Sequence, residues 1–139
     1  LIAAGFSRYG FRREAARIFE GLFAAATYVD LMRLPELFCG FPRETHTVPV
    51  PYPTACSPQA WAAASIPSVL ASSLGLEADA FEHRLTLRRP FLPTTIPDLK
   101  LQGLRVGSAS VDLTFCRNGN RTEVAVDKVR GECEVSVEE

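Results

Sequence analysis

The best candidate for acid–base chemistry lies in a short apolar run, Arg33–Gly40. Glu36 follows a proline there, and Leu34 and Leu37 flank it. A carboxylate pressed among apolar groups has its charged form disfavoured unless it finds a partner, so such a group can serve as an acid or a base. Arg33 could tune that carboxylate. The alternative interpretation is a loop carboxylate that accepts a backbone hydrogen bond or pairs with Arg33.

Other catalytic patterns are absent from the sequence. It has no Gly-x-x-x-x-Gly-Lys phosphate loop, no Gly-x-Gly-x-x-Gly fingerprint and no Gly-x-Ser-x-Gly elbow. His46 and His83 have no nucleophile at a recognisable spacing. No Cys-x-x-Cys pair occurs among the four cysteines, Cys39, Cys56, Cys116 and Cys133. We therefore expect reduced thiols, no metal site and no other cofactor.

Composition and charge narrow the class of protein. With 139 residues, 47% of them hydrophobic and 22% charged, the chain fits one ordered domain or a large piece of one. Fifteen Lys and Arg against sixteen Asp and Glu argue against a nucleic-acid partner. No apolar run approaches the roughly 20 residues that span a bilayer, and no secretory start is visible. We expect a cytoplasmic protein with no membrane partner.

Helices are expected before and after the Glu36 run. Helical spacing of apolar residues predicts a first helix over residues 2–9, which Gly10 ends. A broad apolar stripe from Ala15 to Ala26 predicts a second helix. A third is expected from Ser57 as cap to Leu74. Its residues are small or apolar nearly all round, which predicts burial on more than one side, with a kink or split at Pro67.

Residues 33–57 connect the second and third expected helices. Five prolines, at 35, 42, 49, 51 and 53, forbid a continuing helix, and the segment is rich in aromatic residues. Long ordered loops in compact domains tend to be functional. We expect an ordered loop wall rather than a flexible linker.

Beyond Phe81 the apolar period becomes two, which predicts strands. Gly103 is expected to mark a bulge, and residues 117–120 read Arg-Asn-Gly-Asn, a hairpin turn. The fold class is therefore α+β, with helices first and then a small antiparallel β-meander. Because the helical pattern already runs at Leu1 without a capping residue, we expect the C-terminal fragment of a larger domain.

Two motifs at a defined spacing carry a family resemblance. The run Arg33–Gly40, followed about twenty residues on by Cys56-Ser57-Pro58-Gln59-Ala60-Trp61, resembles the C-terminal part of bacterial glycogen-debranching, amylo-α-1,6-glucosidase-like enzymes. Those enzymes carry a Leu-Pro-Glu-Leu loop and then a Cys/Ser-x-x-Gln-Ala-Trp helix start. Leu1–Ala26 is similar to the helix pair just upstream in that family. The resemblance covers residues 1–75 well and continues more loosely through the β segment.

The resemblance implies a fold, a reaction and a base. Residues 1–80 would be the last helices of an (α/α)6 glycosidase barrel, with 33–57 as its active-site loop, and 81–139 an antiparallel β segment. The reaction would be hydrolysis of α-1,6-linked glucose stubs on branched α-glucans, with inversion and with Glu36 as general base. An inverting pair also needs an acid about 6.5–9.5 Å away. That acid lies upstream in the family, so the fragment alone is not expected to hydrolyse substrate.

The same resemblance suggests substrate contacts. Gln59 and Trp61 match positions where an amide can hold sugar hydroxyls and an indole can stack on a pyranose face. Arg33, Phe38 and Tyr52 are further candidates. The alternatives are a core position for Trp61, loop packing for the two other aromatic residues and an ion pair for the arginine.

Two other roles compete with the hydrolase. The first is a non-catalytic accessory or structural domain that binds carbohydrate or a partner protein. Only Phe91 and Phe115 are aromatic in residues 85–139, which favours a structural cap over a lectin-like sheet. The second, a stand-alone interaction protein, conflicts with the uncapped start. The expected partners are an α-glucan or oligosaccharide and the missing N-terminal part, and we expect the fragment to hide apolar helix faces by self-association.

Overall fold

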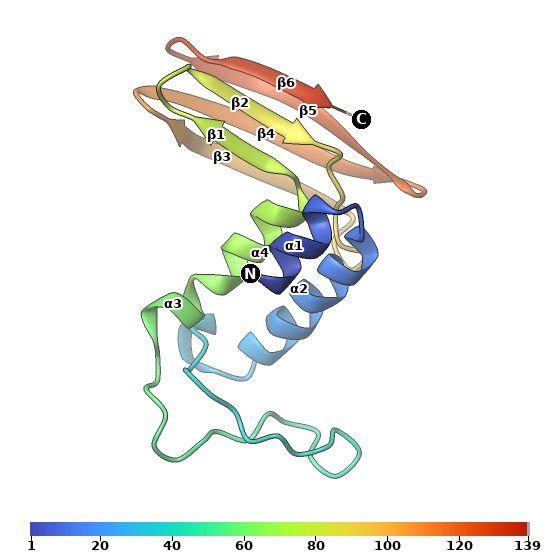
Figure 1. The fold of residues 1–139 in the computed structure, drawn as a ribbon, viewed down its shortest axis with the longest axis vertical. Helices are drawn as coiled ribbons and strands as arrows, with labels where there is room; N and C mark the ends of the chain where they lie inside the picture. The colour runs from blue at the N-terminus through green and yellow to red at the C-terminus, as the bar shows by residue number, and fades with distance from the viewer. Residues whose placement is uncertain (139) are drawn as a thin grey trace.

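The computed structural model describes residues 1–138 as a helical layer at one end of two stacked β-sheets (Figure 1). The helices are α1 (Ile2–Arg8), α2 (Arg12–Ala26), the 3-10 turn η1 (Asp30–Met32), α3 (Ala60–Ala63) and α4 (Ser65–Ser73). The strands are β1 (Leu76–Asp79), β2 (Arg84–Arg88), β3 (Asp98–Val106), β4 (Ala109–Asn118), β5 (Arg121–Arg130) and β6 (Glu134–Glu138). The α+β class with helices first is confirmed. Within these residues the helices close no barrel.

The first two predicted helices are confirmed as α1 and α2. Gly10 follows α1 with φ of 85°, the left-handed conformation that ends a helix. The apolar stripe of α2 faces α1 and α4, and Phe19 is buried there together with Ala3 and Val69. This small cluster fixes α2, whose C-terminal end leads into the 33–57 loop.

The third predicted helix differs from the expectation in its start and in its burial. Gln59 is extended, because its N–H donates to the Leu34 carbonyl at 3.2 Å, so the helix begins at Ala60 rather than at Ser57. The predicted split is confirmed, since α3 and α4 are separate and Pro67 lies in the first turn of α4. Burial on more than one side is wrong. No residue of α3 is buried, and α4 buries only Val69 and Ser73.

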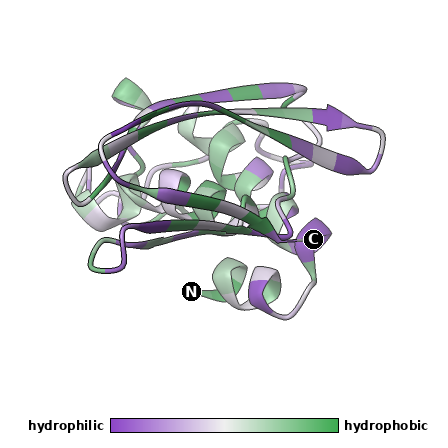
Figure 2. Ribbon diagram, turned by 90° about the horizontal axis from the view of Figure 1, so that it is seen from above, coloured by the Kyte–Doolittle hydropathy of each residue, from purple (hydrophilic) through white to green (hydrophobic). Residues whose placement is uncertain are grey.

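The strands form two three-stranded sheets rather than one antiparallel meander. One sheet has the order β3-β4-β5 and is antiparallel, as predicted. The other has the order β1-β2-β6, and β6 lies parallel to β2. Viewed from above, the strands form two layers along which hydrophilic and hydrophobic residues alternate (Figure 2). The meander prediction fails because the last strand crosses to the opposite sheet.

One apolar core joins the two sheets. Leu85 and Leu87 from β2 pack in the same cluster as Leu113 and Phe115 from β4, and all four side chains are fully buried. Leu74, just after α4, reaches into this cluster from the helical layer. The core is therefore that of a face-to-face sandwich capped at one end by helices.

Local predictions for the antiparallel sheet hold. The β3–β4 register shifts between Leu101 and Leu104, at the bulge predicted for Gly103. The β4–β5 hairpin turns through Gly119, which has φ of 61°. These two irregularities lie where the period-two pattern is interrupted by glycine.

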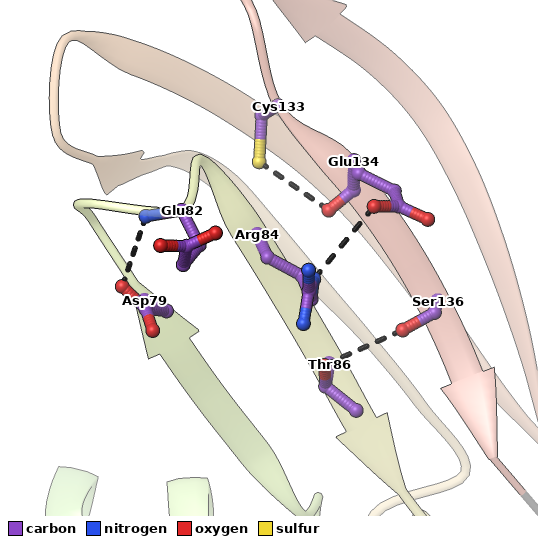
Figure 3. Close-up of polar contacts among 7 residues, drawn as sticks. All are labelled: Asp79, Glu82, Arg84, Thr86, Cys133, Glu134 and Ser136. Atoms are coloured by element: carbon purple, nitrogen blue, oxygen red, sulfur yellow. Dashed lines mark hydrogen bonds and ion pairs between the residues drawn. The ribbon is translucent and has the colours of Figure 1, made fainter.

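Polar contacts fix the β1–β2 turn and the parallel β2–β6 pair (Figure 3). The Asp79 carboxylate accepts from the N–H of Glu82 at 3.1 Å. Arg84 Nε lies 3.7 Å from the Glu134 carboxylate, and the Ser136 hydroxyl donates to the hydroxyl of Thr86 at 3.4 Å. These side-chain contacts follow the β2–β6 backbone register and join residues 50 positions apart, so no local sequence pattern contains them.

Candidate functional site

The 33–57 loop folds back on itself through a few backbone pairs. The Glu36 N–H donates to the Cys56 carbonyl at 2.9 Å, and Cys39 N–H donates to the Val50 carbonyl at 2.9 Å. An isolated β-bridge joins Phe38 to Pro51. These pairs lay the start of the loop beside its end, at the side of the molecule away from the sheets (Figure 1). Two motifs about twenty residues apart in sequence are thereby brought together.

Glu36 is exposed, although the two residues before it are buried. Leu34 and Pro35 are buried, whereas the glutamate side chain lies on the surface. Its Oε2 accepts a hydrogen bond from the Cys56 N–H at 3.3 Å. The expectation of a carboxylate pressed among apolar groups is therefore wrong. In residues 1–138 no ion pair joins it to Arg33, which is also exposed.

Gln59 and Trp61 extend this contact into a chain of side chains. With the Gln59 amide nitrogen turned toward Glu36, it donates to Oε2 at 3.3 Å. In that orientation, which the hydrogen-bond network assigns, the amide oxygen accepts from the indole N–H of Trp61. Trp61 is 76% exposed, so the core interpretation of this tryptophan is wrong. The structure unites the three residues that the two motifs had singled out.

The other candidate contacts lie apart from this chain. Phe38 is half-buried and lines a cavity of about 290 Å³ between the end of α2 and the loop. Phe41 and His46 stack at the same cavity, with ring centroids 4.6 Å apart. Tyr52 is 48% exposed and does not line this cavity. Over the described part of the chain, neither Arg33 nor Tyr52 hydrogen-bonds to Glu36.

The alternative interpretation of Glu36, a loop carboxylate that accepts a backbone hydrogen bond, is confirmed, although the sequence did not identify the donor. The backbone N–H of Cys56 holds the glutamate carboxylate, and a backbone donor leaves no trace in residue type. The Cys56 thiol itself is free and exposed. Burial raises the pKa of the thiol of Cys133, which lies directly before β6 and far along the chain from this site.

The arrangement suits contact with a hydroxyl-rich ligand. An exposed carboxylate can accept a proton from water or a hydroxyl, and an exposed indole can lie against the face of a sugar ring. The amide between them orients both groups. Residues 1–138 contain no group of three His, Cys, Asp or Glu side chains placed to hold a metal ion. Within the same residues, no helix combines the length and apolar character that a bilayer crossing requires.

Comparisons with family models, with curated proteins and with solved structures give no match to this chain.

Proposed function

We propose that Glu36 is the general base of an inverting glycoside hydrolase that removes α-1,6-linked glucose stubs from branched α-glucans. The observation that carries this proposal is a chain of hydrogen-bonded side chains that runs from Trp61 through Gln59 to Glu36. Both the indole and the carboxylate at its ends are exposed. This arrangement places a ring platform, an amide and a carboxylate side by side. These are the groups needed to hold a sugar and to deprotonate a water beside it.

The hydrogen bonds of Glu36 suit a base. Both recorded bonds, from Cys56 N–H and from the Gln59 amide, reach Oε2. In the described residues Oε1 accepts no hydrogen bond, so it is open to a water molecule. The two donors orient the carboxylate and leave one lone-pair face for the reaction, as base catalysis requires.

The indole of Trp61 supplies the binding surface in this proposal. Its N–H is held by the Gln59 oxygen, which fixes the plane of the ring, while 76% of the residue stays exposed. A fixed aromatic face costs little conformational entropy when a pyranose ring stacks on it. The branch glucose would lie over this indole with its anomeric carbon near Glu36.

The general acid belongs to a part of the catalytic domain outside residues 1–139 in this proposal. In the same proposal, α1, α2 and α4 belong to an (α/α)6 barrel of a cytoplasmic enzyme. Further helices of that barrel cover their apolar outer faces. Tyr9 is 81% exposed and Phe11 54% exposed, which supports such a cover. In the absence of those helices, self-association would cover the same faces.

Glucose release tests the base directly. The longer enzyme that supplies the acid is given an α-1,6-branched limit dextrin, and wild type is compared with Glu36→Gln. We expect kcat to fall about 10²–10⁴-fold, because the amide cannot take a proton, while dextrin binding persists. The matched control is Glu44→Gln, an exposed glutamate of the same loop, which should keep full activity.

Two results would overturn the assignment. Full activity of Glu36→Gln would make the glutamate structural, and the hydrolase would then need another base. Dextrin binding by a wild type that releases no glucose would replace the hydrolase with a non-catalytic carbohydrate-binding role. No glucose release by wild type would refute the substrate class.

A binding experiment needs only residues 1–139. Trp61 is the single tryptophan of the sequence, so intrinsic fluorescence reports on the site without labelling. We expect isomalto-oligosaccharides to change its emission with saturation, and Gln59→Ala to weaken that binding because the indole loses its hydrogen bond. Unchanged emission at millimolar oligosaccharide would contradict stacking on Trp61.

A further inference from the structure

A second pocket lies between α2 and the β4–β5 hairpin, on the helix–sandwich junction. Its volume is about 340 Å³, within the range of small-molecule sites. Arg13 and Arg17 line it from α2, and Arg117 and Arg121 line it from the two ends of the hairpin turn. Half-buried Phe91 contributes an apolar wall. Nothing in the 33–57 loop lines this pocket.

The charge of the pocket is strongly positive although the chain has a formal charge of −1. Glu20 is the only acidic residue among the lining residues, so four arginines less one glutamate leave +3. The Glu20 carboxylate is already engaged, because Oε1 accepts from both the N–H and the hydroxyl of Thr94, at 3.0 and 2.6 Å. None of the four arginines makes an ion pair with a carboxylate in residues 1–138.

Another hollow of the molecule, beside α1, pairs an arginine with carboxylates. Between α1 and the β1-β2-β6 sheet, Arg88 Nε lies 3.0 Å from the Glu77 carboxylate and 3.5 Å from that of Glu138. Those two carboxylates line the same hollow as Arg8, Arg88 and Arg89, so most of the positive charge there is compensated within the chain. The pocket beside α2 lacks such compensation.

Several contacts fix the walls of the arginine pocket. Arg117 Nη1 donates to the Pro93 carbonyl at 3.3 Å, which orients its guanidinium. The Leu92 N–H donates to the Thr122 hydroxyl at 2.8 Å and ties the Phe91–Thr94 segment to β5. A guanidinium presents five donors, so Arg117 keeps free N–H groups after this bond.

We infer that this pocket binds the phosphate group of a small molecule. Guanidinium groups match phosphate oxygens in bidentate geometry, and several of them around one cavity can share the charge of a dianion. The volume leaves room for an organic part against Phe91. Free phosphate and a phosphate monoester share this chemistry. The inference is independent of the proposed hydrolase, since the two sites have no residue in common.

Calorimetric titration of residues 1–139 tests the pocket with three probes. Inorganic phosphate, glucose 6-phosphate and uncharged glucose are titrated in turn at low ionic strength, where charge contacts are least screened. We expect heat from the two phosphates and none from glucose. Tighter binding of the sugar phosphate would identify a monoester as the ligand, and equal binding would identify free phosphate.

Variants assign the binding to the arginines. Arg17→Gln with Arg121→Gln removes two exposed residues of the pocket and should weaken phosphate binding at least tenfold. The matched control, Arg43→Gln with Arg105→Gln, removes two exposed arginines elsewhere and should bind like wild type. Equal binding of phosphate by the two double variants would overturn the inference. The absence of heat from either phosphate at about 10 mM ligand would overturn it as well.

Folding of the variants is checked separately. Each double variant changes only surface arginines, so the fold should be kept. Circular dichroism and the melting temperature should match wild type in each double variant. Arg17→Glu offers a second reading, since a like charge facing the phosphate should abolish binding while the fold is kept. Loss of phosphate binding with intact glucose release would leave the hydrolase standing, and the reverse result would leave only this pocket.

Discussion

The sandwich and the 33–57 loop differ in burial and in backbone hydrogen bonding. In the sandwich, β4 alternates buried and half-buried residues, and Leu113 and Phe115 expose none of their surface. Its backbone pairs with β3 on one side and β5 on the other along most of its length, with one register shift in each ladder. The loop has a single β-bridge and scattered backbone bonds, and Leu37 and Phe41 are each about half exposed.

This difference separates stability from chemistry. Burial of apolar surface supplies the main favourable free energy of folding, and the sandwich contains most of the fully buried large side chains. The loop buries little, so its side chains remain available to a ligand. An exposed residue of the loop can therefore be changed with a small effect on unfolding, and a residue of the sandwich core cannot.

Truncating one aromatic residue in the sandwich and one in α3, directly after the loop, gives the largest expected contrast. Phe115→Ala removes a fully buried ring between the sheets and should lower the free energy of unfolding by about 3–5 kcal/mol. Trp61→Ala removes a ring that is 76% exposed and should change it by about 0.5 kcal/mol or less. Urea unfolding followed by circular dichroism measures both. Equal losses would show that the exposed site residue Trp61 contributes as much to stability as the buried Phe115.

Two glycines with left-handed backbone, Gly75 and Gly119, extend the comparison to the junction between the helical layer and the sandwich. Gly75 has φ of 63°, and a Cβ there would overlap the Arg88 carbonyl. Gly75→Ala should therefore cost about 2–4 kcal/mol, since strain and overlap add. Gly119 has a similar φ of 61° with open space around it. Gly119→Ala should cost only the strain, about 1–2 kcal/mol. Equal melting temperatures would refute the overlap.

Sequence patterns sufficed where the signal is local. The apolar stripe of α2 and the alternation in β4 are each set by residues close in sequence, so period alone predicts them. The prolines of the loop likewise excluded helix over 33–57, where the structure has none. The Glu36 neighbourhood was located from two motifs at a fixed spacing, which the loop pairing brings together.

Non-local contacts explain what the sequence missed. The sequence pattern could not identify β2 as the partner of β6, because the alternation around Val135 is the same whichever sheet the strand joins. The start of α3 depends on Leu34, whose carbonyl holds Gln59 extended from 25 residues away. The exposure of Glu36 depends on which way the backbone turns after Pro35. Apolar neighbours in sequence do not fix that direction.

The smallest expected effect is a loss of sandwich stability in acid through protonation of one carboxylate, that of Asp112. The hydrogen bond from Arg130, whose Nη2 lies 2.9 Å from Asp112 Oδ2, lowers the pKa of Asp112, and the Gly103 N–H at 2.7 Å lowers it further. A lowered pKa in the folded state gives stability that is present above the ordinary value of about 3.9 and lost as pH falls through the folded value. Arg130→Gln should reduce this acid dependence in urea unfolding between about pH 5 and pH 2, and Asp112→Asn should remove it. An unchanged profile in Asp112→Asn would place the acid sensitivity elsewhere and leave the β3–β4 bulge held by its backbone alone.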